Sequence, residues 1–173
     1  MNSTRHVVLV GLMGSGKTTV GCLLAARLAR PFVDNDVVLE SRTGRSAREI
    51  AAEEGVEALH LREAEALVDA LASPLPAVIA AAAAAPLEPP AAAAMQAHDV
   101  VYLRATPDVL AARLARAPDD GHRPFVDGDA RAVLAEQFAA RDERYRALAT
   151  LVVDANVDAP ETVVDEIISA LAR

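Results

Sequence analysis

The chain of 173 residues contains one cysteine, no tryptophan, and aromatic side chains at only 3% of its positions. The single cysteine, Cys22, excludes a disulfide within the chain and fits the reducing environment of the cytoplasm. We expect Cys22 to be a buried structural thiol. The scarcity of aromatic rings leaves little surface on which nucleic-acid bases could stack.

Positive charge is also scarce, because the formal net charge at pH 7 is −8. Proteins that bind nucleic acid independently of sequence need a basic face, so this class of partner is excluded. The longest apolar run, from Ala77 to Ala85, is too short to span a bilayer, and no membrane partner is expected. We expect residues 1–173 to form a single domain that acts as a monomer in the cytoplasm on a small molecule.

Residues 11–19, with the sequence GLMGSGKTT, match the phosphate-loop motif G-x-x-x-x-G-K-[ST]. The motif follows the apolar run 7–10, typical of a buried strand, and precedes the helical apolar spacing of residues 20–30. In such a loop Lys17 reaches the β- and γ-phosphates, and the Thr18 hydroxyl ligates Mg²⁺. The alternative is a glycine-rich turn that only connects a strand to a helix. We expect the nucleotide to be bound by Gly14, Ser15, Gly16, Lys17, Thr18 and Thr19.

Strand and helix patterns alternate along the rest of the chain, which predicts an α/β fold. Strands are predicted near residues 7–10, 32–33, 77–81, 99–103 and 151–153. Helices are predicted over residues 20–30, 46–55, 57–71, 91–96, 106–116, 129–148 and 160–171, the second of them with a Ser46–Glu49 capping box. Residues 117–128 are rich in turn formers and are predicted to be a mobile loop. We therefore expect a five-stranded parallel sheet with helices on both faces and a lid loop.

Three further groups of polar residues are candidates for chemistry. Asp34 and Asp36 follow a predicted strand; one could hold Mg²⁺, and the other could orient a substrate hydroxyl or accept its proton. Arg123 lies in the predicted mobile loop, from which it could close over the γ-phosphate. Arg141, beside Tyr145 on a predicted helix, could clamp a substrate carboxylate. The alternatives are a solvated turn, a loop arginine and a helix-surface arginine, respectively.

Taken in order, these motifs resemble the shikimate kinases, small P-loop kinases of the nucleoside monophosphate kinase class, over essentially the whole chain. Residues 11–21, 32–36 and 43–46 carry the resemblance, and Arg123-Pro124 and Arg141/Tyr145 follow at similar spacing. The resemblance implies ATP-dependent phosphorylation of shikimate with Mg²⁺, within aromatic amino acid biosynthesis. It assigns phosphate to Lys17, Mg²⁺ to Thr18 and Asp34, and the reacting hydroxyl to Asp36. It also assigns transfer to Arg123, the acceptor carboxylate to Arg141, and the adenine side to Arg113 and to the loop that contains Asn156.

We expect the acceptor-binding region at about residues 34–64, and two departures from the resemblance affect acceptor binding, one inside this region and one beyond it. His60 stands where the resemblance implies an arginine that binds the shikimate carboxylate, and imidazole is shorter and lacks the guanidinium fork. Ala82, Ala83 and Ala84 stand where it implies glycines, so any position with a positive φ would be penalised. Shikimate is the best single acceptor. The alternative acceptor is a gluconate-like or other hydroxy acid, and the alternative function is nucleotide binding without transfer activity. For His60, the alternative is a helix-surface residue without a ligand.

Overall fold

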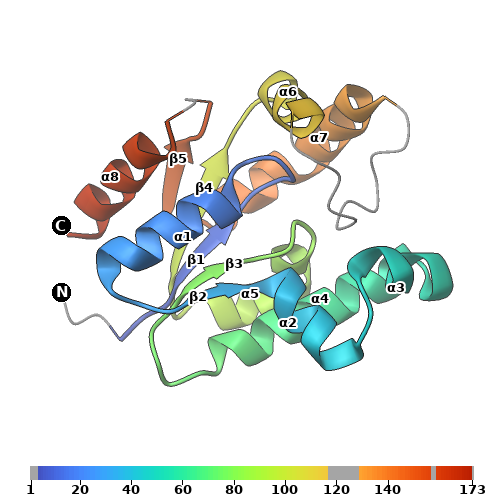
Figure 1. The fold of residues 1–173 in the computed structure, drawn as a ribbon, viewed down its shortest axis with the longest axis horizontal. Coiled ribbons are helices and arrows are strands. Elements are labelled where there is room, and N and C mark those ends of the chain that lie inside the picture. Colours follow the sequence, from blue (N-terminus) through green and yellow to red (C-terminus); the bar gives the residue numbers. More distant parts are fainter. Residues whose placement is uncertain (1–3, 117–128, 157–158, 173) are drawn as a thin grey trace.

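The structure is a computed structural model that describes residues 4–116, 129–156 and 159–172 (Figure 1). Its five strands form one parallel sheet in the order β2-β3-β1-β4-β5. The strands are β1 (Val7–Val10), β2 (Phe32–Asp34), β3 (Val78–Ala80), β4 (Asp99–Arg104) and β5 (Leu151–Asp154). The predicted five-stranded parallel sheet is therefore confirmed, and each predicted strand is present within two residues of its expected bounds.

Helices cover both faces of the sheet (Figure 1). Helices α1 and α8 pack together against one face, whereas α4 and α5 pack together on the other with α7. The helices are α1 (Lys17–Leu28), α2 (Asn35–Thr43), α3 (Ala47–Glu54), α4 (Val56–Leu71), α5 (Pro89–Met95), α6 (Pro107–Arg116), α7 (Ala130–Leu148) and α8 (Pro160–Leu171), with a 3₁₀ turn η1 (Ala85–Leu87). Because both faces are covered, every residue of β1 is buried, as its continuous apolar sequence predicts.

Two expectations differ from the structure. Helix α2 was not predicted, although Asp34 is a good N-cap, and its carboxylate accepts the backbone N–H of Asp36. Cys22 is exposed rather than buried. The buried positions of α1 are Val20, Gly21, Leu24 and Ala25, which leaves residue 22 on the solvent-facing side of the helix. The prediction of a lid over residues 117–128, including Arg123, lies outside the described residues.

Within residues 4–116, 129–156 and 159–172, no helix combines the length and the apolar character needed to cross a membrane.

Candidate active site

A cavity of about 490 Å³ lies at the carboxyl ends of β1, β2 and β3. These three strands are neighbours in a parallel sheet, so the segments that follow them meet at one edge. The predicted nucleotide residues that line the cavity are Gly14, Gly16, Lys17, Thr18, Thr19, Asp34 and Arg113. The predicted acceptor residues that line it are Asp36, His60, Ala82, Ala83, Ala84 and Arg141. The structure thus brings most of both predicted sets into a single cavity, but Ser15 and Asn156 do not line it, and Arg123 lies outside the described residues.

The phosphate loop needs glycine at the positions that turn toward the cavity. Gly14 has a φ of +81°, and a Cβ there would lie 3.1 Å from the carbonyl oxygen of Leu110. Gly16 has a φ of +92° and is the N-cap of α1. The loop therefore runs directly into a helix N-terminus, whose free N–H groups and partial positive charge suit phosphate.

Lys17 points back over the phosphate loop. Its Nζ donates hydrogen bonds to the carbonyl oxygens of Gly11, at 2.9 Å, and Leu12, at 3.1 Å. Burial lowers the pKa of Lys17, and the negative charges of Asp36 and Asp34 oppose this shift. The ammonium group is thus held between the phosphate loop and two carboxylates.

Thr18 and Asp34 place two oxygen atoms side by side. The Thr18 hydroxyl donates to Oδ2 of Asp34 at 3.0 Å, while Oδ1 of Asp34 caps α2. Mg²⁺ usually takes one or two oxygen ligands from a protein and completes its shell with phosphate and water. The oxygen pair fits such a cation next to the phosphate loop.

The part of the cavity that the predicted acceptor residues line, called here the acceptor half, contains two groups that burial keeps uncharged near neutral pH. Burial raises the pKa of Glu63, on α4, to about 8, and the negative charge of Asp36 adds to this shift. Burial lowers the pKa of half-buried His60, and the nearby Arg141 cation lowers it further. Arg141 thus supplies a positive charge that neither of these two neighbours neutralises at pH 7.

Glu63 was left out of the predicted site residues, although it lines the same cavity and is only 7% exposed. Its position three residues after His60 on α4 is the signal that could have found it, since such residues share a helix face.

Residues 82–84 form part of the cavity wall in ordinary backbone conformations. Among the described residues, Ala29 is the only non-glycine residue with a positive φ. The φ penalty was expected only for positions with a positive φ, and it does not arise at Ala82, Ala83 or Ala84, because the chain turns there without entering the left-handed region. What these alanines add to the site is the volume of three methyl groups.

The residues predicted to contact adenine do not all line the main cavity. Arg113 lines both the main cavity and a smaller one of about 180 Å³, where Ser15 and Thr19 also lie. Asn156 instead binds protein groups: its Oδ1 accepts the N–H of Thr106 at 2.9 Å, and its Nδ2 donates to Asp154 at 2.7 Å. Asn156 shapes the loop that ends β5, and its predicted contact with nucleotide stays a prediction.

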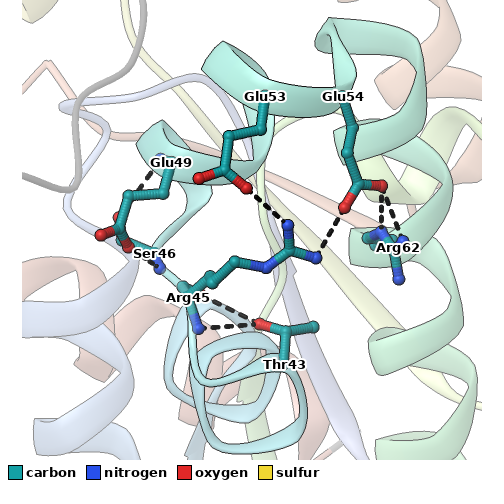
Figure 2. A network of polar contacts seen from close by, with 7 residues as sticks. All are labelled: Thr43, Arg45, Ser46, Glu49, Glu53, Glu54 and Arg62. Atoms are coloured by element: carbon teal, nitrogen blue, oxygen red, sulfur yellow. Dashed lines mark hydrogen bonds and ion pairs between the residues drawn. The ribbon is translucent and has the colours of Figure 1, made fainter.

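A polar network fixes the helices that carry the acceptor residues (Figure 2). Arg45 binds Glu53 at 2.8 Å and Glu54 at 2.6 Å, and Glu54 also accepts from Arg62 on α4 at 2.7 Å. The predicted capping box is confirmed, since Ser46 and Glu49 bond each other's backbone N–H at the start of α3. Beneath the network lies a small core formed by Leu39, Ala47, Ile50 and Leu59. The network and this core join the end of α2 and the helices α3 and α4 to one another.

Comparisons with known proteins agree with this geometry. The family model described as "Shikimate kinase" matches residues 13–172. The chain is 37% identical over 173 residues to shikimate kinase 2 of Yersinia enterocolitica, covering 98% of this chain and 97% of that protein. It is 38% identical over 161 residues to shikimate kinase of Thermobifida fusca, covering 93% and 91% of the two chains.

Among solved structures, shikimate kinase from Acinetobacter baumannii in complex with shikimate superposes with a TM-score of 0.91 at 29% identity. The match covers 98% of this chain and 94% of that one. A family model and relatives that both span nearly the whole sequence leave no long segment unmatched. The chain therefore belongs to the shikimate kinase family.

Proposed function

We propose that this protein transfers the γ-phosphoryl group of ATP to a hydroxyl group of shikimate. One observation carries the proposal: a single cavity is lined by residues of the phosphate-loop motif and by Asp36 and Arg141. A carboxylate suits a reacting hydroxyl, and a guanidinium suits a substrate carboxylate. The cavity thus holds a partner for each end of a hydroxylated carboxylic acid.

On the nucleotide side, the protein binds the phosphates and compensates their negative charge. The N–H groups at the start of α1 bind phosphate oxygens, and the Lys17 ammonium group balances their negative charge. Thr18 and Asp34 would hold Mg²⁺, which would offset the negative charge of the phosphates. Arg123 is proposed to contact the transferred group from the segment outside the described residues.

On the acceptor side, Asp36 accepts the proton of the attacking hydroxyl, and Arg141 pairs with the acceptor carboxylate. Protonated Glu63 and neutral His60 add hydrogen-bonding capacity without adding negative charge. This balance favours an acceptor with one carboxylate. A neutral sugar would offer Arg141 no carboxylate, and protonated Glu63 would not supply one at neutral pH.

A panel of acceptors tests the proposal. ADP formation from ATP is measured with shikimate, quinate, gluconate or buffer alone, and the phosphorylated product is identified by mass spectrometry. We expect shikimate-dependent turnover that Asp36→Asn reduces strongly. Turnover with gluconate alone would indicate a different acceptor. ADP binding without any acceptor-dependent turnover would indicate a nucleotide-binding protein that lacks transfer.

One chain is proposed to be sufficient for activity, because all the described groups named here line a cavity within one chain. A cytoplasmic location is proposed as well, since the single, exposed Cys22 thiol suits a reducing compartment. Activity that is proportional to enzyme concentration, together with a monomer mass in solution, would support the first of these proposals.

A further inference from the structure

Asn35, the first residue of α2, lies between Asp34 and Asp36 in the chain and is fully buried. Its Nδ2 donates a hydrogen bond to the backbone carbonyl oxygen of Glu63, on α4, at 3.1 Å. Asp36 and Glu63 both line the cavity. One buried hydrogen bond thus ties the start of the helix that carries Asp36 to the helix that carries Glu63.

This hydrogen bond is not needed to complete α4. Glu63 lies in the interior of α4, where a backbone carbonyl already accepts the N–H group four residues later. Asn35 therefore binds the second lone pair of that oxygen. Its contribution is to fix α2 against α4 rather than to satisfy the backbone.

The amide of Asn35 is also costly to bury. Its Oδ1 has no hydrogen-bond partner within residues 4–116, 129–156 and 159–172. A buried acceptor without a partner lowers stability, so an apolar side chain of similar size would suit the packing better. The position that the amide gives to α2 accounts for its presence, whereas stability does not.

The contact at Asn35 differs from the one a turn later on α2. The other buried residue of this helix, Leu39, lies in the small apolar core that also contains Leu59 of α4. Apolar contacts have no preferred direction, whereas a hydrogen bond fixes both the distance and the direction between two atoms. The end of α2 nearest the cavity is therefore the end that is held precisely.

The preceding residue fixes the same end of α2 to the other side of the site. The carboxylate of Asp34 accepts from the Thr18 hydroxyl at 3.0 Å and from the N–H of Asp36 at 3.1 Å. Asp34 and Asn35 thus attach the first turn of α2 to α1 and to α4, respectively. Asp36 follows both attachments directly, so its backbone is held from two sides.

We propose that Asn35 is a positioning residue for phosphoryl transfer, whose amide holds Asp36 in register with Glu63. Asn35 acts through Asp36 on the transfer step, and it leaves nucleotide binding unchanged. The inference rests on the proposed function for the role of Asp36 as proton acceptor, but the bond between Asn35 and Glu63 does not depend on it.

The variant Asn35→Leu keeps the approximate size of the side chain and removes the donor. We expect kcat with shikimate to fall about tenfold, with the KM for ATP within about twofold of wild type, because a small displacement of a reacting group slows transfer. Leu39→Val is the matched control, since it removes a buried contact from the same helix, and its kcat should stay within about twofold. Asn35→Ser, whose side chain is too short to reach α4, should reproduce the loss if Asn35→Leu does not fold.

A double-mutant cycle separates positioning from general loss of stability. In an Asp36→Asn background the group that Asn35 positions is already lost, so Asn35→Leu should lower the remaining kcat by less than about threefold. Equal fold-changes in both backgrounds would overturn the proposal, as would equal kcat values for Asn35→Leu and Leu39→Val.

The titration of Glu63 reports the same positioning without any acceptor. Burial raises the pKa of Glu63, the negative charge of Asp36 adds to the shift, and the positive charges of Arg141 and Lys17 oppose it. If α2 moves away from α4, water enters and the charge of Asp36 acts more weakly. The midpoint of the Glu63 titration in Asn35→Leu should therefore fall by about one pH unit.

This titration is followed by ¹³C NMR of protein labelled at the side-chain carboxyl carbon of glutamate, with Glu63 assigned by Glu63→Gln. Leu39→Val should titrate as wild type does. If wild type fails to phosphorylate shikimate, the proposed function is wrong, and the titration still decides the role of Asn35. Identical Glu63 titrations in wild type and Asn35→Leu would refute that role.

Discussion

The two halves of the cavity are built in different ways. The nucleotide half comes mainly from one contiguous segment, residues 11–19, whose backbone is shaped by three positive-φ glycines and runs into the N-terminus of α1. The acceptor half is assembled from α2, α4, the segment after β3, and α7, with one or a few side chains from each. The nucleotide half depends on backbone shape and therefore tolerates few substitutions. In the acceptor half, the side chains come from four separate elements, so each can be substituted without changing the others.

This difference fits the positions of the residues that depart from the expected shikimate kinase pattern. His60 and Ala82–Ala84 all belong to the acceptor half, and the sheet and helices around them keep ordinary geometry. The network of Arg45, Glu54 and Arg62 holds α3 and α4 together without contacting the nucleotide half (Figure 2). Changes in acceptor contacts can therefore be accommodated without loss of the fold.

The largest expected effect comes from breaking the nucleotide half at Lys17. Lys17→Ala should lower kcat by about 10²–10³-fold and weaken ADP binding, because the charge that faces the phosphates is lost. Lys17 is the only lysine of the chain, so no other lysine can take its place. Steady-state kinetics and calorimetry with ADP measure both effects.

Arg27→Ala is the matched control, since Arg27 lies at the far end of α1 in an exposed ion pair with Asp165. It should bind ADP as wild type does. If Lys17→Ala also kept full affinity for ADP, the assignment of residues 11–19 as a phosphate-binding loop would be wrong.

A smaller effect is expected from titrating the acceptor half at Glu63. Because burial raises the pKa of Glu63 to about 8, its carboxylate ionises between pH 7 and 9. The new negative charge pairs with Arg141 and repels an acceptor carboxylate, so the KM for shikimate should rise several-fold over this range. Glu63→Gln should abolish that rise, and a rise of the same size in Glu63→Gln would exclude Glu63 as its source.

Glu63 should also affect stability, with a sign set by the same shift. Its pKa is raised from 4.5 to about 8, so its contribution is complete below pH 4.5 and is lost as the pH rises through 8. The Tm of wild type should therefore fall more between pH 6 and 9 than the Tm of Glu63→Gln.

The smallest effect concerns neither half of the cavity. At the amino ends of β1 and β4, the N–H of His6 donates to Nδ1 of His98 at 3.3 Å, which requires that nitrogen to be unprotonated. Burial lowers the pKa of His98, and the charges of His6 and Arg5 add to the shift. Stability from this contact is thus present above pH 6.5 and is lost as the pH falls below it.

Thermal unfolding between pH 7.5 and 5.5 measures this effect. His98→Asn, which keeps a hydrogen-bond acceptor, should lose part of the acid sensitivity while its ADP affinity and KM for shikimate at pH 7.5 stay unchanged. An altered KM would mean that this edge of the sheet communicates with the cavity.

The contrast between the contiguous nucleotide half and the dispersed acceptor half also determines what could be predicted from the sequence. The fold followed from alternating patterns, and the phosphate loop followed from a motif whose residues are adjacent in the chain. Glu63 and Tyr145 interact with groups distant in the sequence: Glu63 lies near Asp36 and Arg141, and the Tyr145 hydroxyl donates to Ala83, 62 positions away. Sequence spacing places such residues on a helix face but does not say which backbone atom of another element they reach.

Cys22 and residues 82–84 show a second limit. The apolar character of cysteine predicted burial, but the packing of α1 against the sheet decided which of its faces is covered. An alanine run in place of glycines would strain the backbone only where φ is positive, and the sequence does not specify the φ values.

The most direct test of the account compares the KM for shikimate with the KM for ATP in four proteins. These are wild type, His60→Arg, the triple change Ala82→Gly, Ala83→Gly and Ala84→Gly, and all four changes combined. A regained bidentate contact is worth about 1.5–3 kcal/mol, so the combined variant should lower the KM for shikimate by roughly one to two decades. Each partial variant should recover less, and the KM for ATP should stay within about twofold of wild type. An unchanged KM for shikimate in the combined variant would contradict the account. It would mean that His60 and the three alanines do not weaken the binding of shikimate.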